Sequence, residues 1–586
     1  MTPPEPIAAP ASPEPVAPPA SPEPPAASAS PEPVDGPALA RNGGDLVVET
    51  LTALGTDVLF GIPGQHALGL FDALSRHAGD VPPDRGGSIR LVASRTENNA
   101  AFAADGYARA TGRPGVMFVS TGPGALTALA GLQEAYATSV PIVLISSQIP
   151  RAGLGGRRKG FLHQLDDQRR SAENVVKHSE LVEHAAGIVP ALQRAWRTAL
   201  TAPQGPVWVE ITQDTLLEPT VLPPVADVSG APEPLPARAE LLDLAAQWLA
   251  GAERPVILAG GGVRRGRAEA ELLAVAEAVR APVVCTPGGK GAFDWQHPLS
   301  AQSWVEDVAT TELLADADVL LVIGTSLGEV TSNYFTLRPR GRIVQIDATA
   351  RVLESNFPAL GIHADAKLAL AGLAERLQPR ASDGRAEDAV ETLLEIVEGR
   401  LDGQDLAHER GVLGAIRAAL PDDAQTFWDM TIAGYWAWSC WDPRSGEFHS
   451  AQGAGGIGWA YGAALGAAVG LGRRVLAVNG DGGAMYGIGE LAVARQHNLP
   501  VTWLIVDDGG YGILREYMTD AFGAPTATEL VRPDFAALAE AFGVPATVTT
   551  PETLREDLVD AWLAEGPNVV VLPTRLAMFA ATHLGT

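Results

Sequence analysis

The sequence predicts an α/β protein with three doubly wound parallel-sheet domains, preceded by a disordered proline-rich tail. Periodic apolar segments of helical length alternate with short runs of β-branched residues, as in repeated βα units. Two stretches rich in proline or in polar turn residues interrupt this alternation. The 586 residues also exceed what one hydrophobic core accommodates. Several α/β domains in series are therefore expected.

Residues 1–40 form the expected tail. They contain 14 of the 46 prolines and a nine-residue repeat, with PPEP at position 3 and SPEP at positions 12, 21 and 30. A Pro-Glu-Ala-Ser composition cannot bury a core, so an extended, solvated segment is expected.

The first domain is expected at residues 41–216, a linker at 217–237 and a central domain at 238–378. The strands expected in the first domain are VLFGI, PGVMFVS, PIVLIS and PVWVEI, and those of the central domain are PVILAG, APVVCT, DVLLVIG and RIVQID. Residues 379–404 are expected to form a linker with helical segments. The third domain is expected at 405–580, with strands in DAQTFWD, RRVLAVN, VTWLIVD and NVVVLP.

Composition excludes several classes of partner. A net charge of −27 repels nucleic-acid phosphates and anionic lipids. The longest apolar stretch, 456–472, consists mainly of Gly and Ala and falls short of a membrane span. Two cysteines fit a reducing compartment, and a secretory signal pattern is lacking. We therefore expect a cytoplasmic protein that acts on a small molecule and binds neither nucleic acid nor membrane.

The most informative motif follows an expected strand in the third domain. Strand 474–479 runs into a glycine-rich turn that carries one carboxylate; the residues of this turn are Gly480, Asp481, Gly482 and Gly483. Glycine permits positive φ and close backbone approach, so such a turn can present amide groups and an acid to a ligand. The tetrapeptide alone is also compatible with a purely structural turn.

A second acidic turn follows the next strand, 501–506. Asp508 lies 27 residues after Asp481 and is followed by Gly510 and Tyr511. If the two strands are neighbours, a right-handed crossover brings both carboxylates to one edge of the sheet. Two such oxygen ligands, a backbone carbonyl and diphosphate oxygens together suit Mg²⁺.

These residues resemble a known family. The segment NGDGGAMYGIGELAVARQHNLPVTWLIVDDGGYG is similar to the diphosphate-binding signature of thiamine-diphosphate enzymes, which include acetolactate synthase and benzoylformate decarboxylase. The similarity extends over about residues 41–575. It implies thiamine diphosphate and Mg²⁺ as cofactors, with Asp481, Asp508 and the carbonyl of Gly510 as metal ligands. The family usually has Asn at the position of Asp508.

The same resemblance assigns a catalytic acid in the first domain. RTENNAAFAADGYAR reads as a helix capped at Ser94 or Thr96 and closed at Gly112. From this pattern alone, Glu97 is a first-turn surface glutamate. The stretch is similar to the family segment in which a glutamate hydrogen-bonds the aminopyrimidine of the cofactor, which implies that Glu97 is catalytic.

The family similarity also implies a cofactor-binding segment before the diphosphate signature. Ile457 stands where the family has a bulky apolar residue under the bent cofactor, and the Gly455 carbonyl matches the acceptor of the aminopyrimidine N–H. In family members the two cofactor-binding domains belong to different subunits. The resemblance thus implies that Glu97 and Asp481 meet across the interface of a homodimer or homotetramer.

The family includes enzymes that decarboxylate a 2-oxo acid and then release an aldehyde or join the remaining fragment to a second carbonyl. His163 and Gln164 occupy the position at which acetolactate synthases have Phe-Gln, and a histidine can move protons. Gln65 and His66 follow a Pro-Gly turn and are further candidates. The nearby Asp166 and Asp167 offer charges to a cationic substrate, although a solvated acidic face is the preferred explanation.

Three function classes stay open. The first is a 2-oxo acid decarboxylase or carboligase, with an acetolactate synthase that joins two pyruvates as its main alternative. The second is a flavin-linked oxidase, for which FAD would bind the central domain; GGGVRRG lacks the GxGxxG pattern, which weakens it. The third is a non-catalytic scaffold, suggested only by the tail.

Overall fold

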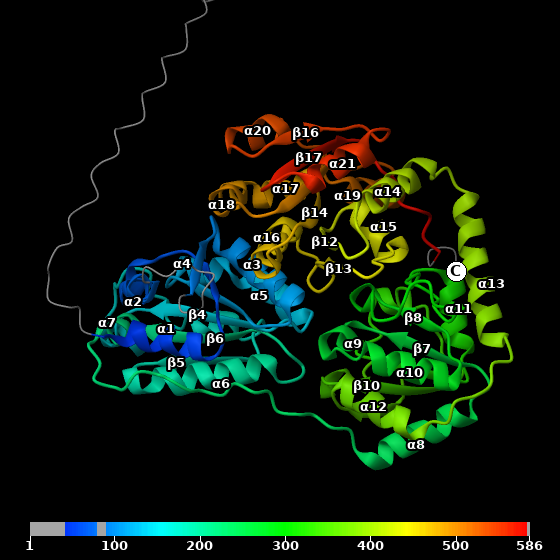
Figure 1. Ribbon diagram of the computed structural model, residues 1–586, viewed down its shortest axis with the longest axis horizontal. Helices are drawn as coiled ribbons and strands as arrows, with labels where there is room; N and C mark the ends of the chain where they lie inside the picture. Colours follow the sequence, from blue (N-terminus) through cyan, green and yellow to red (C-terminus); the bar gives the residue numbers. More distant parts are fainter. Residues whose placement is uncertain (1–40, 79–88, 583–586) are drawn as a thin grey trace, which may run out of the picture. The chain divides into compact units, whose positions relative to one another are not determined.

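A computed structural model describes residues 41–78 and 89–582 (Figure 1). The predicted tail at residues 1–40 lies outside these residues. The described chain contains three parallel sheets of six, five and six strands, which confirms the predicted fold class.

The first sheet has the strand order β2-β1-β3-β4-β6-β5. Its strands are β1 (Val58–Gly61), β2 (Arg90–Ala93), β3 (Gly115–Val119), β4 (Ile142–Gln148), β5 (His178–Val182) and β6 (Val207–Thr212). The accompanying helices are α1 (Gly43–Ala53), α2 (Leu68–Ala78), α3 (Glu97–Thr111), α4 (Pro123–Thr127), α5 (Leu129–Ala137), α6 (Ile188–Leu200) and α7 (Gln213–Leu217).

The central sheet has the order β11-β10-β9-β7-β8. Its strands are β7 (Pro255–Ala259), β8 (Val283–Cys285), β9 (Val319–Ile323), β10 (Arg342–Asp347) and β11 (Leu360–His363). Its helices are α8 (Ala239–Gly251), α9 (Gly261–Gly266), α10 (Glu269–Val279), α11 (Val308–Asp316) and α12 (Ala366–Arg376), and α13 (Arg385–Asp402) follows.

The third sheet has the order β13-β12-β14-β15-β17-β16. Its strands are β12 (Gln425–Trp428), β13 (Glu447–Ser450), β14 (Val475–Gly480), β15 (Val501–Asp507), β16 (Ala546–Val548) and β17 (Asn568–Pro573). Its helices are α14 (Ala407–Ala419), α15 (Ile432–Cys440), α16 (Trp459–Leu471), α17 (Asp481–Gly487), α18 (Leu491–His497), α19 (Gly512–Phe522), α20 (Phe535–Ala541) and α21 (Leu554–Leu563).

Both faces of each sheet are buried. In β3, Val116 and Phe118 pack into one core, whereas Met117 and Val119 pack into another. Alternate residues of a strand point to opposite faces, so two cores per sheet require helices on both sides. The continuous apolar runs of the central strands follow from this double burial.

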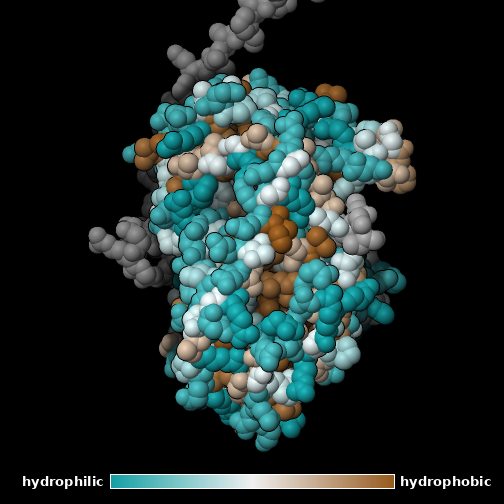
Figure 2. Space-filling view, turned by 90° about the vertical axis from the view of Figure 1, so that its right-hand side faces the viewer, coloured by the Kyte–Doolittle hydropathy of each residue, from teal (hydrophilic) through white to brown (hydrophobic). Residues whose placement is uncertain are grey.

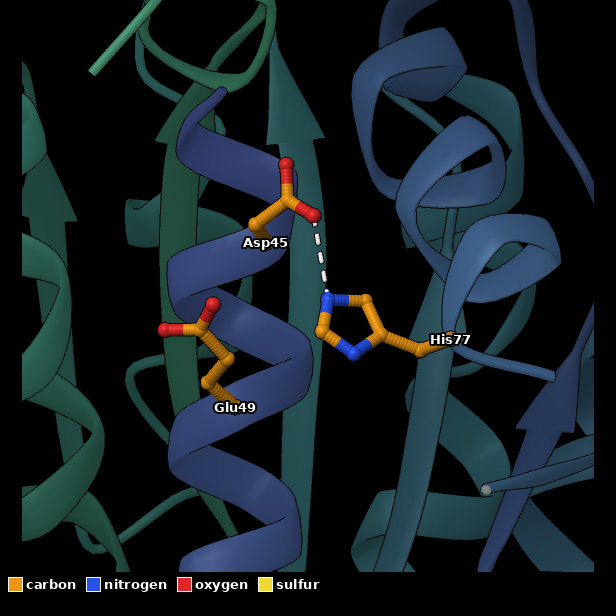
Figure 3. A group of neighbouring side chains, drawn as sticks. All are labelled: Asp45, Glu49 and His77. Carbon is orange, nitrogen blue, oxygen red and sulfur yellow. Dashed lines mark hydrogen bonds and ion pairs between the residues drawn. The ribbon is translucent and has the colours of Figure 1, made fainter. Parts of the chain in front are cut away.

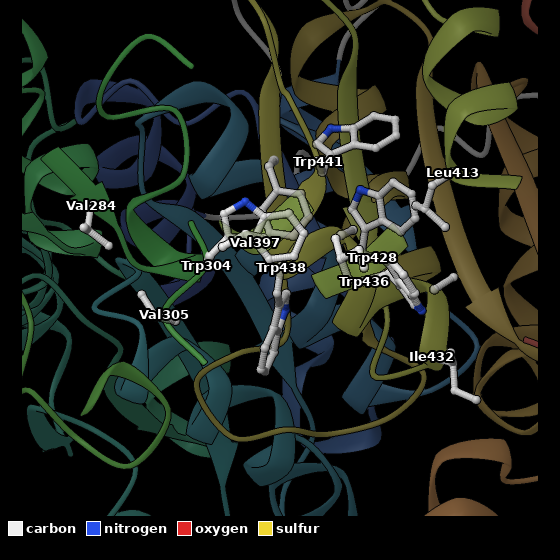
Figure 4. Close-up of a cluster of buried hydrophobic side chains, with 14 of the residues drawn as sticks. Val284, Trp304, Val305, Val397, Leu413, Trp428, Ile432, Trp436, Trp438 and Trp441 are labelled. Atoms are coloured by element: carbon white, nitrogen blue, oxygen red, sulfur yellow. The ribbon is translucent and has the colours of Figure 1, made fainter. Parts of the chain in front are cut away.

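The central and third sheets share one core. Val284 and Trp304 of the central part lie in the same cluster as Trp428, Trp436 and Trp438 of the third (Figure 4). These large aromatic side chains bury much apolar area at the boundary and hold the two parts together.

Helix α3 of the first sheet packs closely against α16 of the third (Figure 1). A Cβ atom added at Gly106 would lie 1.9 Å from the carbonyl oxygen of Ala463, and one added at Gly466 would lie 1.8 Å from that of Ala103. The helices therefore approach backbone to backbone, which only glycine allows at these positions.

Figure 2 shows a mostly hydrophilic face with a group of apolar residues near its middle. No helix in the described ranges is long and apolar enough to cross a membrane.

Candidate active site

The third sheet brings the two predicted metal-binding aspartates to one edge. Strands β14 and β15 are parallel neighbours, with Gly480 opposite Val506. Asp481 is the first residue of α17, and Asp508 follows the last residue of β15. The charge of Asp508 acts directly on Asp481. The spacing argument therefore gives the correct strand neighbours, and both acids leave the carboxyl end of the sheet.

Asp481 is completely buried, yet neither of its carboxylate oxygens accepts a hydrogen bond within the described chain. Nε of Arg532 lies 3.5 Å from Oδ2 but bonds Asp507 more closely, at 2.6 Å. Burial and the charge of Asp508 raise the pKa of Asp481 to about 7. Buried polar atoms are normally satisfied, so two bare oxygens beside a second carboxylate fit a divalent cation.

Glycines shape the turn next to Asp508. Gly509 and Gly510 have φ values of 96° and 148°, and a Cβ at Gly510 would lie 1.9 Å from the carbonyl oxygen of Thr528. A Cβ at Gly482 would meet the ring of Tyr511 at 2.6 Å. Side chains are thus excluded on both turns, which leaves the backbone free to approach a diphosphate.

Asp429, which lies after β12, has a role that was not predicted. Its buried carboxylate accepts hydrogen bonds from the backbone N–H of Gly458 at 2.8 Å and Trp459 at 3.2 Å, and from the Asn479 amide at 2.7 Å. Burial raises its pKa to about 6. Asp429 therefore ties the start of α16 to the end of β14. Its only sequence signal is an acid directly after a strand.

The predicted cofactor turn at Gly455 and Ile457 is accessible. Gly455 is exposed with a φ of 69°, and Ile457 is half-buried. The buried carboxylate of Glu134 on α5 holds the preceding residues by accepting from the N–H groups of Gly453 at 3.2 Å and Ala454 at 2.7 Å. The first sheet thus fixes a turn that belongs to the third. Glu134 is far away in sequence and was not predicted.

Glu97 begins α3, as predicted. The Thr96 hydroxyl caps this helix by accepting from Asn99 N–H at 3.2 Å, and Gly112 ends it with a φ of 69°. The Glu97 carboxylate lies against the turn after β3, because a Cβ at Gly124 would be 3.0 Å from its Oε1.

His163 lies against the same turn. A Cβ at Gly122 would be 2.9 Å from the Cβ of His163, which itself has a φ of 64°. The ring of His163 meets that of His66 edge to face, with centroids 5.5 Å apart. Among the described residues, Nδ1 of each ring is buried without a hydrogen-bond partner, and burial together with His163 lowers the pKa of His66. Gln65, beside His66, is exposed.

Gln164 has a different environment. Its amide bonds four backbone groups of its own loop, including Gly160 N–H at 2.9 Å and Gly153 carbonyl at 3.0 Å. Gln168, which was not predicted, is buried and accepts from Gly122 N–H at 2.7 Å while donating to Glu210 at 2.8 Å. Gln168 therefore supports the turn between Glu97 and His163. Asp166 and Asp167 are exposed.

Glu490 fastens the start of α3 to the third sheet. Its buried Oε1 accepts from the N–H groups of Arg95 at 2.8 Å and Thr96 at 3.2 Å. Nearby, the Asn99 amide donates to the Tyr486 carbonyl at 3.1 Å. These contacts bring the Glu97 helix and the helix of the diphosphate turn into one assembly.

Glu490→Ala should destabilise the protein by about 1–3 kcal/mol, since two buried N–H groups lose their acceptor. Burial raises the pKa of Glu490 to about 7, above its ordinary 4.5. The folded state therefore holds the proton more tightly, so stability declines as pH rises from 4.5 to 7. Glu490→Gln keeps an acceptor and removes this decline.

Urea unfolding at pH 5 and pH 7.5 checks both effects. From pH 5 to pH 7.5, the free energy of unfolding of Glu490→Gln should rise by about 2–3 kcal/mol relative to that of the unaltered protein. An equal pH dependence in both proteins would contradict the argument.

A cavity of about 720 Å³ borders the central sheet, apart from the candidate site described above. It lies outside the ends of β7 and β9, which are neighbours at the point where the strand order reverses. Its walls include Gly262, Gly324, Arg265, Asp347 and Gln452. This volume suits a nucleotide-sized ligand.

Another acidic group is structural. Asp45, Glu49 and His77 lie together between α1 and α2 (Figure 3). Asp45 caps α1 and pairs with Arg76 at 2.7 Å, and Glu49 pairs with Arg41 at 2.7 Å. Guanidinium groups already satisfy these carboxylates, so we interpret the group as an ion-pair network.

Comparison with known proteins agrees with this geometry. Family models of the thiamine pyrophosphate enzymes match in three places: the N-terminal TPP binding domain at residues 41–170, the central domain at 242–373 and the C-terminal TPP binding domain at 429–572.

Curated relatives cover most of the chain. A "probable 2-ketoarginine decarboxylase" of Pseudomonas aeruginosa is 32% identical over 89% of this chain and 91% of its own. The acetolactate synthase large subunit of Parasynechococcus marenigrum is 29% identical over 91% of this chain and 88% of its own. A "probable acetolactate synthase large subunit" of Methanocaldococcus jannaschii is 29% identical over 90% and 91%. The chain therefore belongs to the thiamine pyrophosphate (thiamine diphosphate) enzyme family, alongside acetolactate synthases and 2-oxo acid decarboxylases.

Proposed function

We propose that the protein is a thiamine-diphosphate- and Mg²⁺-dependent enzyme that decarboxylates a 2-oxo acid. The observation that carries this proposal is the buried carboxylate of Asp481, whose two oxygens lack hydrogen-bond partners in the described chain while Asp508 lies beside it. Burial and, after it, repulsion between the two carboxylates raise the pKa of Asp481, and a bound cation would offset both.

The proposed ligands of Mg²⁺ are Asp481, Asp508 and the carbonyl of Gly510. The glycine turns at Gly480, Gly482 and Gly483 leave room for the diphosphate, and Tyr511 packs over Gly482. Bound thiamine diphosphate supplies an electron sink for the electron pair that remains when CO₂ leaves. The protein binds and orients this group.

Glu97 is proposed to hold the proton that the aminopyrimidine exchanges. The Gly455 carbonyl would accept from the amino group of the cofactor, and Ile457 would provide an apolar contact for its rings. Glu134 and Asp429 are positioning residues, since they fix the residues on either side of Gly455 by backbone hydrogen bonds. Preorganised donors and acceptors of this kind stabilise the reacting geometry without rearrangement.

His163 is proposed to deliver the proton that ends the reaction as an aldehyde. Its Nδ1 is buried without a partner in the described chain and its ring meets that of His66, so no other protein group within the described ranges competes for this nitrogen. In this reaction, one 2-oxo acid anion and one proton give one aldehyde and one CO₂. Gln65 is proposed to contact the substrate. Gln164 is proposed to shape the His163 loop.

Two alternatives have specific support. Joining of two pyruvates, as in an acetolactate synthase, is favoured by the names of several relatives. A flavin-linked 2-oxo acid oxidase is favoured by the cavity at β7 and β9, which would hold FAD. We further propose a homodimer or homotetramer in the cytoplasm, in which Glu97 of one subunit meets the Asp481 site of another.

The test is incubation with thiamine diphosphate, Mg²⁺ and a panel of 2-oxo acids that includes pyruvate and 5-guanidino-2-oxopentanoate. CO₂ and products are measured by mass spectrometry. An aldehyde one carbon shorter supports the proposal, and acetolactate from pyruvate supports the first alternative. Absorbance near 450 nm, typical of flavins, in the purified protein supports the second. Absence of CO₂ from every acid would refute the proposal.

A further inference from the structure

A carboxylate without a cationic partner lies at the boundary of the central and third parts. Glu306 precedes α11, and its Oε1 accepts a hydrogen bond from the Tyr334 hydroxyl at 2.8 Å. Glu306 is only partly exposed, and burial raises its pKa. Within residues 41–78 and 89–582, no ion pair satisfies this side chain. Carboxylates this far from water are usually paired with a cation.

Tyrosines from three elements surround this charge. Burial raises the pKa of Tyr334, of Tyr435 on α15 and of Tyr517 on α19, and the charge of Glu306 adds to each shift, so all three hydroxyl groups lie within its field. Glu516, next to Tyr517, is a second carboxylate; it accepts from Met578 N–H at 3.2 Å and has no ion pair in the described chain. Aromatic faces beside unpaired carboxylates form an environment that attracts a cation.

An apolar wall lies under these polar groups. Trp304 and Val305 directly precede Glu306 and belong to the same buried cluster as Trp438 and Ile432 (Figure 4). Tyr435 packs against this core, and its ring meets that of Trp438 edge to face at 4.9 Å. Such a wall suits the methylene groups of an extended side chain.

This group of residues lies close to the proposed reaction site. Tyr435 is in the first turn of α15, only about 6 Å along the helix from Thr431. The adjacent Met430 reaches the cofactor turn, because its Cε would lie 3.8 Å from a Cβ at Gly455. Helix α19, which carries Tyr517, begins directly after the diphosphate turn at Tyr511. Tyr517 is 50% exposed, so a small molecule can reach the group from solvent.

We propose that Glu306, surrounded by Tyr334, Tyr435 and Tyr517, selects 2-oxo acids whose far end carries a cation, and a guanidinium group in particular. A planar guanidinium forms paired hydrogen bonds with a carboxylate and stacks on aromatic rings, which matches the groups present here. Asp166 and Asp167 are exposed and are not needed for this role. This inference rests on the proposed decarboxylation.

The test compares two substrates of equal length. 5-Guanidino-2-oxopentanoate carries a cation, whereas 2-oxo-5-ureidopentanoate replaces the charged nitrogen by a neutral oxygen. The protein should prefer the guanidino acid by about 10- to 100-fold in kcat/KM, as expected for one charge-assisted hydrogen bond. Glu306→Gln should remove this preference and leave kcat/KM for the ureido acid within about threefold.

Two further variants make the result specific. Glu306→Asp keeps the charge and should retain part of the preference, which guards against a misfolded Gln variant. Glu240→Gln removes an exposed charge from α8 and should change neither substrate. Equal losses for both substrates in Glu306→Gln, or no preference in the unaltered protein, would overturn the inference.

Binding of 5-guanidinopentanoate, which lacks the oxo group, separates this inference from the proposed function. Calorimetric binding that Glu306→Gln weakens by about tenfold or more supports the cation site even if no 2-oxo acid is decarboxylated. Decarboxylation with no dependence on Glu306 leaves the proposed function standing and refutes the cation site.

Discussion

Glu97→Gln is expected to lower turnover of the best 2-oxo acid by about 10²- to 10⁴-fold, the usual contribution of a positioned acid–base group. Gln has nearly the same shape as Glu but cannot take up or release a proton at neutral pH. Thr96 and Asn99 cap α3 through their own atoms, so the helix should form unchanged.

Two measurements are needed for this variant. Initial rates of CO₂ release give the loss of turnover, and the shift in melting temperature on adding thiamine diphosphate and Mg²⁺ shows whether the cofactor still binds. Glu375→Gln on the exposed side of α12 is the matched control and should behave as the unaltered protein. A Glu97→Gln enzyme with more than about a third of normal turnover would exclude a proton-transfer role.

Asp481→Asn is expected to have opposite effects in the absence and presence of cofactor. Without cofactor, the variant should be more stable by roughly 1–4 kcal/mol at pH 7.5, because the buried repulsion with Asp508 disappears. The sign follows from the raised pKa of Asp481, about 7 when folded against 3.8 when unfolded, which costs stability as pH rises through this interval. With cofactor, the variant lacks the proposed metal ligand, and activity should be lost.

Urea unfolding with and without thiamine diphosphate and Mg²⁺ measures this reversal. Thiamine diphosphate and Mg²⁺ should raise the free energy of unfolding of the unaltered protein, as expected for any ligand that binds only the folded state. They should raise that of Asp481→Asn only a little. Asp508→Asn introduces the residue that the family usually has there and should retain measurable binding. Asp560→Asn on the exposed side of α21 is the surface control. If Asp481→Asn destabilised the cofactor-free protein, the carboxylate would be structural.

The predicted strands are those buried on both faces. All twelve apolar runs named from the sequence are strands, whereas β2, β5, β11, β13 and β16 were not predicted. Each of these five lies at the edge of its sheet. An edge strand needs only a short or interrupted apolar pattern, as in the half-buried residues of β2, so the sequence signal is weak.

The residues of the candidate site likewise divide into those that the sequence predicts and those that it does not. Asp481, Asp508 and Glu97 lie in local motifs, at strand ends or helix starts, so their placement follows from neighbouring residues. Glu134 and Asp429 act on backbone groups 320 and 29 residues away, and their sequence surroundings show no motif. Such long-range hydrogen bonds depend on how whole helices pack, which a local pattern does not encode.

The contact of Gly106 with Ala463 has a consequence for fragments of this protein. A fragment of the chain that ends in the central region would expose the face of α3 that contains Gly106. This fragment would lack α16, the helix that packs against that face. Limited proteolysis or gene truncation should therefore yield insoluble halves rather than two separately folded products, although 347 residues of sequence separate the two helices.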